Sequence, residues 1–157
     1  MADYTTEIDS RLIPTGRLMP VQGTPFDFNT ARPIGRYINA ADPQLENGSG
    51  YDHYFVLSQV KSGWPVVRVL APETGIQLEA FTTEPGLQFY TANSLQSRAG
   101  KTGISYGPRS GFCLEPQFWP DAPNQQAFPT AFLKKGDRYH QSTGYRFSLA
   151  GYSGRRI

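Results

Sequence analysis

Three polar side chains are candidates for chemistry, because each interrupts an aromatic or apolar segment of strand length. Asp52 follows the glycine-rich stretch 47–50, Gln88 alternates with aromatic residues, and Glu115 ends an apolar run. A carboxylate in such a place is energetically costly unless it is paired or lies in a solvated cleft. Carboxylates and carboxamides can bind the hydroxyls of a sugar, and aromatic rings can cover its C–H faces. The pattern is therefore compatible with a carbohydrate site.

Each candidate also has a purely structural interpretation. Asp52 would cap a turn beside a surface His53, Gln88 would be the outward residue of a half-buried strand, and Glu115 would form an ion pair at a strand end. Signatures of several other enzyme classes are absent from the sequence. It has no P-loop, no Rossmann glycine pattern, no His-Glu-x-x-His and no Ser-His-Asp arrangement.

The composition favours short β-strands as the elements that position these residues. Sixteen Gly and thirteen Pro divide the 157 residues into short segments, and aromatic residues, 13% of the chain, favour strands. A net charge of +2 provides no basic surface of the kind that binds nucleic acid or an anionic membrane. We expect one all-β domain over residues 1–157, with 151–157 as a flexible tail and with neither nucleic acid nor a membrane as partner.

Turn signals delimit the expected strands. The turn 72–75 predicts a hairpin between segments 66–70 and 76–81. Further strands are expected at 18–21, 26–28, 51–57, 87–91, 112–115, 130–133 and 139–149. The polar stretches 42–50 and 94–105 and the proline-rich stretch 118–129 are expected to be loops.

Cysteine usage and the absence of apolar runs indicate the setting. Cys113 is the single cysteine, so no internal disulfide is expected, and no cluster of residues matches a zinc pattern. No stretch approaches the roughly 18 apolar residues of a membrane-spanning helix, and residues 1–10 do not resemble a signal peptide. These features predict a soluble, cytoplasmic protein without a metal.

Several segments, taken together, resemble the aldose 1-epimerase (galactose mutarotase) family. The matching motifs lie at residues 12–16, 20–27, 50–53, 82–91, 110–117 and 119–124. They occur in the order that the family has, across residues 2–148, and they resemble its C-terminal half. The implied fold is an antiparallel β-sandwich like the family's galactose mutarotase-like supersandwich, at half its length.

The resemblance implies an isomerase of hexose metabolism that interconverts the α and β anomers of a free aldose such as galactose or glucose. It implies no cofactor. The family's catalytic base, a glutamate that takes the proton from the anomeric hydroxyl, corresponds to Glu115. The residues that hold sugar hydroxyls correspond to Asp52 and Gln88.

The family's proton donor is a histidine in the N-terminal half, which this chain does not contain. His53 should point away from Asp52, because consecutive strand residues face opposite sides, and His140 is expected at the surface. A half-length sandwich would leave unpaired strand edges and apolar faces, so we expect a homodimer or pairing with a separate N-terminal half.

Two alternatives to the epimerase remain open. The chain could be a non-catalytic carbohydrate-binding module that keeps Asp52, Gln88 and Glu115 as a recognition site. It could also be a structural relic without a ligand, although the presence of all three polar residues favours the first two readings.

Overall fold

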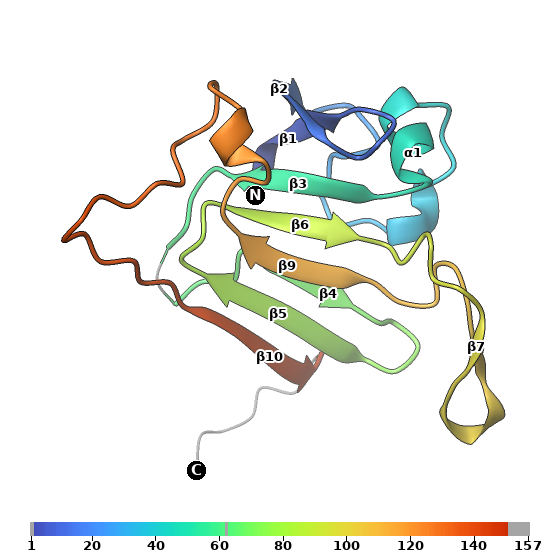
Figure 1. Ribbon diagram of the computed structural model, residues 1–157. Coiled ribbons are helices and arrows are strands. Elements are labelled where there is room, and N and C mark those ends of the chain that lie inside the picture. Colours follow the sequence, from blue (N-terminus) through green and yellow to red (C-terminus); the bar gives the residue numbers. More distant parts are fainter. Residues whose placement is uncertain (1, 62, 151–157) are drawn as a thin grey trace, which may run out of the picture.

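The computed structural model describes residues 2–61 and 63–150 and consists mainly of antiparallel strands (Figure 1). The strands are β1 (Ala2–Ile8), β2 (Pro14–Pro20), β3 (Asp52–Leu57), β4 (Val67–Leu70), β5 (Ile76–Thr82), β6 (Gly86–Tyr90), β7 (Arg98–Ala99), β8 (Ser105–Tyr106), β9 (Cys113–Gln117) and β10 (Thr143–Leu149). The helical elements are α1 (Pro43–Gly48) and the 3-10 turns η1 (Ile34–Arg36), η2 (Lys101–Gly103) and η3 (Ala122–Asn124). No helix within the described ranges is long and apolar enough to cross a membrane. The expected tail at 151–157 lies outside the described residues.

Two sheets form the molecule, and a small ribbon of β7 and β8 projects from them (Figure 1). The larger sheet has the order β2-β1-β3-β6-β9, and the smaller sheet has the order β10-β5-β4. All strand pairs are antiparallel. β9 therefore lies at an edge of the larger sheet, with β6 as its strand neighbour.

The core lies between the two sheets and is rich in aromatic residues. Strand alternation turns Phe55, Phe89 and Leu114 of the larger sheet inward, where they meet side chains of β4 and β5. The rings of Tyr51 and Phe89 stack with centroids 5.5 Å apart. The same alternation turns Asp52, Gln88 and Glu115 to the other face of the larger sheet. The predicted antiparallel β-sandwich is therefore confirmed.

The sandwich is open at β10. On its inward side this strand carries a row of three large apolar residues, the β10 row, whose exposed fractions are 49% for Tyr145, 69% for Phe147 and 55% for Leu149. In the β5–β10 register, Tyr145 lies opposite Ala80, which is fully buried. The hydroxyl of Tyr145 donates to the backbone oxygen of Leu114 in β9 (2.7 Å). The β10 row thus continues a buried face into solvent.

The expected hairpin of β4 and β5 is confirmed. Of the last two expected strands, 130–133 is absent and 139–149 is shortened to β10. Residues 130–142 form no strand, and the segment from η3 to β10 extends away from the sheets (Figure 1). Its apolar residues 131–133 are consecutive, and Phe132 is 76% exposed because no neighbouring strand covers it. Only the part from Thr143 onward finds a partner, in β5.

Three other expectations also differ from the structure. The stretch 94–105, expected to be a loop, contains β7 and η2. The segment 26–28 is not a strand, and Phe26 enters the core from a turn instead. The stretch 42–50, expected to be a loop, contains helix α1. Its N-cap is Asp42, whose carboxylate accepts hydrogen bonds from the backbone nitrogens of Gln44 (2.9 Å) and Leu45 (3.4 Å).

Candidate functional site

Three neighbouring strands bring the three predicted site residues together. In the β6–β9 register, Gln88 lies directly opposite Glu115. In the β3–β6 register it lies opposite the residue two positions after Asp52. Side chains opposite one another in such a pair have Cβ atoms about 4.5–5.5 Å apart. The Nε2 atom of Gln88 donates to Oδ1 of Asp52 (2.7 Å). The carboxamide thus lies between the two carboxylates.

These side chains line a shallow hollow of about 310 Å³ on the outer face of the larger sheet. This volume is at the small end of the roughly 300–1,000 Å³ that is usual for ligand pockets. The lining residues are Asp52, Gln88, Tyr90, Glu115, Gln117 and Pro120. The hollow therefore offers carboxylates and carboxamides next to one aromatic ring.

The loop before β3 fixes the position of Asp52. The side-chain nitrogen of Asn93 donates to the backbone oxygens of Gly48 (2.8 Å) and Tyr51 (3.0 Å), which ties the end of α1 to the start of β3. Gly50 has φ 135°, and a Cβ there would overlap the Asn93 side chain. Glycine is therefore required at this position, and the strand that follows begins at a defined point.

The two carboxylates have different environments. Asp52 is half-buried, and this burial raises the pKa of its carboxyl group, an effect that the hydrogen bond from Gln88 partly offsets. Glu115 is exposed, because β9 is an edge strand and its outer side is open. The position of each strand in the sheet accounts for this difference.

Sequence reasoning missed three lining residues, although strand periodicity contained the signal. Tyr90 and Gln117 lie two residues after Gln88 and Glu115, respectively, and therefore face the same side. The Tyr90 hydroxyl lies 2.7 Å from the hydroxyl of Ser94 and accepts a hydrogen bond from the backbone nitrogen of Ser94 (3.1 Å). These contacts fix the ring at the rim. Pro120 comes from the turn after β9, which the sequence pattern did not place.

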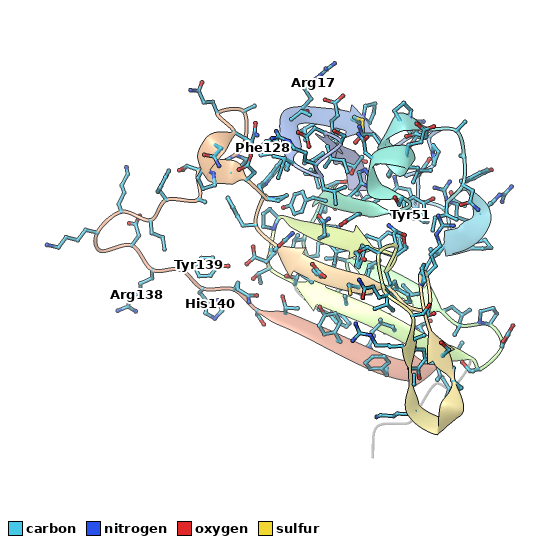
Figure 2. The ribbon with its side chains drawn as sticks, turned by 45° about the vertical axis from the view of Figure 1, so that its right-hand side comes forward. Arg17, Tyr51, Phe128, Arg138, Tyr139 and His140 are labelled. Atoms are coloured by element: carbon cyan, nitrogen blue, oxygen red, sulfur yellow. The ribbon has the colours of Figure 1, made fainter. Side chains whose placement is uncertain are left out.

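Neither histidine lines the hollow. His53 is fully buried on the opposite face, as its place after Asp52 predicted, and its Nδ1 accepts a hydrogen bond from the backbone nitrogen of Asp52 (3.1 Å). Burial lowers the pKa of His53 to about 3, so the ring is neutral. His140 is exposed, on the extended segment that leads into β10 (Figure 2).

The arrangement can bind hydroxyl groups and accept a proton. Two carboxylates and two carboxamides can form hydrogen bonds with several hydroxyls of one ligand. No side chain among the six that line the hollow is cationic. Within the described ranges, the structure brings together no group of three or more His, Cys, Asp or Glu residues suited to a metal ion.

The comparison of the sequence with protein families is decisive for classification. A model of the aldose 1-epimerase family matches residues 1–146. The chain belongs to the aldose 1-epimerase family. The matched region contains all of the strands that line the hollow, so this family's sequence pattern and the site occupy the same part of the chain.

Full-length relatives in the aldose 1-epimerase family are much longer than this chain. The galactose mutarotases of Sus scrofa and Homo sapiens are each 43% identical to it over 150 residues, which are 95% of this chain and 42% of theirs. The aldose 1-epimerase of Escherichia coli K12 is 36% identical over 94% of this chain and 43% of its own length. The chain therefore spans less than half the length of these curated relatives.

Solved structures show the same relation. A GalM/aldose epimerase homologue from C. elegans matches 96% of this chain and 44% of its own, with a TM-score of 0.77 and 29% identity. Galactose 1-epimerase from Lactobacillus acidophilus has the same fold at 23% identity, with a TM-score of 0.69 over 95% of this chain and 42% of its own. The two sheets thus match part of the aldose epimerase fold.

Proposed function

We propose that the chain is the aldose-binding part of an aldose 1-epimerase, with galactose or glucose bound in the hollow on β3, β6 and β9. The observation that carries the proposal is the convergence of Asp52, Gln88 and Glu115 on one hollow, together with family membership. The three side chains come from strands that are far apart in sequence, yet they point to the same place. A structural role for each residue separately would not require this.

In the proposed mechanism, the Glu115 carboxylate takes the proton from the anomeric hydroxyl of the sugar. A proton donor delivers a proton to the ring oxygen, the bond between that oxygen and the anomeric carbon breaks, and an open aldehyde forms. Rotation about the adjacent carbon–carbon bond and closure from the other face give the second anomer, with the protons returned. Asp52 and Gln88 hold hydroxyls and orient the ring. Positioned proton transfer of this kind contributes roughly 10²–10⁴-fold.

The proton donor must come from outside the described lining of the hollow. His53 is buried behind the sheet and His140 lies on the segment before β10. A non-catalytic carbohydrate-binding module is therefore the second candidate function. It is favoured by the fact that the hollow, as lined here, has acceptors and carboxamides but no cationic acid.

We propose further that the chain forms one domain, that it corresponds to the C-terminal half of the family's domain, and that another polypeptide covers its open end. A second copy and a separate N-terminal half are both compatible with the exposed β10 row. The chemistry favours the separate half, because a second copy would add only the same acids and the same buried histidine.

Polarimetry tests catalysis directly. Freshly dissolved α-D-galactose and α-D-glucose are followed with and without the purified chain. A catalysed rate that Glu115→Gln reduces by roughly 10²-fold or more would support the proposed base. A rate equal to that of buffer would exclude catalysis by the chain alone and leave the binding module. Catalysis that survives Glu115→Gln unchanged would contradict the role of Glu115.

Calorimetry tests the sugar site itself. Titration with galactose should release or absorb heat in the unmodified chain, and Asp52→Ala should abolish this signal, because it removes the carboxylate that Gln88 supports. Asp137→Ala, a surface carboxylate on the extended segment, is the matched control and should keep the signal. Absence of binding to both sugars would contradict the proposed site.

A further inference from the structure

Tyr54 reaches from β3 to β9 across the strand that lies between them. Tyr54 is opposite Gln88 on β6, and Gly86, two residues earlier on β6, is opposite Gln117 on β9. All of these residues face the side of the sheet that carries the hollow. Tyr54 is nonetheless only 1% exposed, because its ring lies over Gly86 and packs against Trp119.

Gly86 provides the space that this path needs. A Cβ atom at residue 86 would overlap the Cζ and Oη atoms of Tyr54 and would lie 2.6 Å from its Cε2 atom. Real Cβ atoms do not approach other atoms this closely, so no side chain is compatible with the ring in this position. The pair of Tyr54 and Gly86 is therefore a single structural unit.

The far end of the ring holds the chain at the end of β9. The Tyr54 hydroxyl donates to the backbone oxygen of Gln117 (3.2 Å). Its ring lies 5.5 Å from that of Trp119, which in turn lies 4.8 Å from the ring of Phe128 beside η3 (Figure 2). Burial, and then the charge of Glu84, raise the pKa of Tyr54, so the phenol keeps its proton and remains a donor.

This contact matters because β9 is short and lies at an edge. β6 supplies its strand pairing on one side, and the other side is open. Gln117 and Pro120 form one wall of the hollow, and Glu115 is two residues before Gln117 on the same strand. Movement at the end of β9 would therefore change both the wall and the direction of the Glu115 carboxylate.

We infer that Tyr54 is a positioning residue that fixes the end of β9 through Gln117 and thereby sets where Glu115 and the wall of the hollow lie relative to Asp52. The inference rests on the proposed function in so far as the hollow is a sugar site. Its structural part, the bracing of β9 from β3 through the gap at Gly86, can be measured without any sugar.

The test compares Tyr54→Phe with Tyr51→Phe in the full chain. Each change removes one phenol hydroxyl that donates to a backbone carbonyl, but Tyr51 donates to Pro25 on the core side (2.8 Å). Backbone amide hydrogen exchange should become roughly twofold to tenfold faster at Gln117–Trp119 in Tyr54→Phe, the factor expected for one hydrogen bond. Exchange in β1 and β2 should not change, and Tyr51→Phe should leave β9 unaffected.

Galactose titration is the second measurement. Affinity should fall by roughly the same factor in Tyr54→Phe, and the loss should be absent in Tyr51→Phe. Gly86→Ala, which displaces the ring without removing the hydroxyl, should give the same local exchange pattern.

Two results would overturn the inference: unchanged exchange at Gln117–Trp119 in Tyr54→Phe, or an equal increase across β1, β2 and β9. If the unmodified chain binds neither galactose nor glucose, the proposed function fails, but the exchange comparison still decides the role of Tyr54.

Discussion

At the scale of single residues, position in the sheet controls the chemistry of the two carboxylates more than residue type does. Asp52 is on β3, which has strand neighbours on both sides, and burial raises the pKa of its carboxyl group. Glu115 is on the edge strand and is exposed. A segment placed beside β9 would change the environment of Glu115 far more than that of Asp52. The properties of the proposed base therefore depend on what lies next to β9.

His53 gives a prediction about acid stability. Its pKa is about 3 in the folded chain, against 6.5 for an ordinary histidine. Below pH 6.5 the unfolded chain takes up a proton that the folded chain does not, so the free energy of unfolding falls by about 1.4 kcal/mol per pH unit until about pH 3. Urea unfolding at pH 5.0 should therefore show a loss of about 2 kcal/mol from this residue relative to pH 7.5.

His53→Gln is the variant that isolates this contribution, because it removes the titrating group and keeps a polar side chain. The variant will be less stable at neutral pH if the ring's packing against Phe26, at 4.6 Å between centroids, is lost. Between pH 6.5 and pH 5, the free energy of unfolding of His53→Gln should change less than that of the unmodified chain. Parallel pH profiles for the two proteins would contradict the assignment.

At the scale of elements, a buried carboxylate joins the three strands of the smaller sheet. Glu79 on the central strand β5 is 2% exposed, and its two oxygens accept hydrogen bonds from Arg68 of β4 (2.9 Å) and Arg146 of β10 (2.7 Å). Burial by itself raises the pKa of Glu79, but the hydrogen bonds and charges of Arg146 and Arg68 outweigh it and lower the pKa below the ordinary value. The outer face of this sheet is thus tied together by one side chain.

Glu79→Gln should destabilise the chain by about 1–3 kcal/mol, because the neutral amide cannot accept from both arginines and loses the charge-assisted bonds. Chemical denaturation at pH 7 measures this loss. The folded pKa is lowered, so the stabilising effect is present above the ordinary value of 4.5 and is lost as the pH falls below it. The difference in free energy of unfolding between Glu79→Gln and the unmodified chain should therefore shrink below pH 4.5.

Arg11→Ala is the control for this experiment. It removes the exposed pair of Arg11 and Asp9 (3.1 Å), in which the Arg11 side chain is 81% exposed. Surface pairs of this kind contribute less than about 1 kcal/mol. An equal cost for Glu79→Gln and Arg11→Ala would show that Glu79 does not join the strands.

The elements that the sequence predicts well are those whose formation is decided locally. The β4–β5 hairpin follows from the turn at 72–75 and the alternation after it. The strand expected at 130–133 is absent because an apolar run forms a strand only where a neighbouring strand pairs with it, and that neighbour is not encoded nearby. Helix α1 was missed because Asp42 and Pro43 were read as turn residues, although both also begin helices.

The candidate site was predictable in its members but not in its environment. Asp52, Gln88 and Glu115 were identified from motifs, and they line one hollow. The order of strands in the sheet was not predicted, and this order is what exposes Glu115 and half-buries Asp52. Long-range pairing thus decides the electrostatics of residues whose types can be read directly.

At the scale of the whole molecule, the open end of the sandwich makes the chain prone to association. The β10 row continues the face that buries Ala80. Exposed apolar faces of this kind are usually covered by another protein surface. In the absence of a complementary segment, we expect copies of the chain to associate through the β10 row.

Phe147→Lys should prevent this association, because it places a charge in the middle of the row. Light scattering over a range of concentrations should give species heavier than 17.5 kDa for the unmodified chain and mainly the 17.5 kDa monomer for the variant. Phe132→Lys is the matched control, since Phe132 is equally large and 76% exposed but lies outside the row. A monomeric unmodified chain at all concentrations would contradict the prediction, as would an equal effect of both substitutions.

The alternation along β9 also has an evolutionary consequence. Leu114 points into the core and Glu115 points out of it. Inserting or deleting one residue within this strand would therefore expose the leucine to solvent and bury the acid. Length changes are therefore tolerable in the β7–β8 excursion but not within the five residues of β9. Burial of Leu114 in the core therefore fixes the direction in which the Glu115 side chain points.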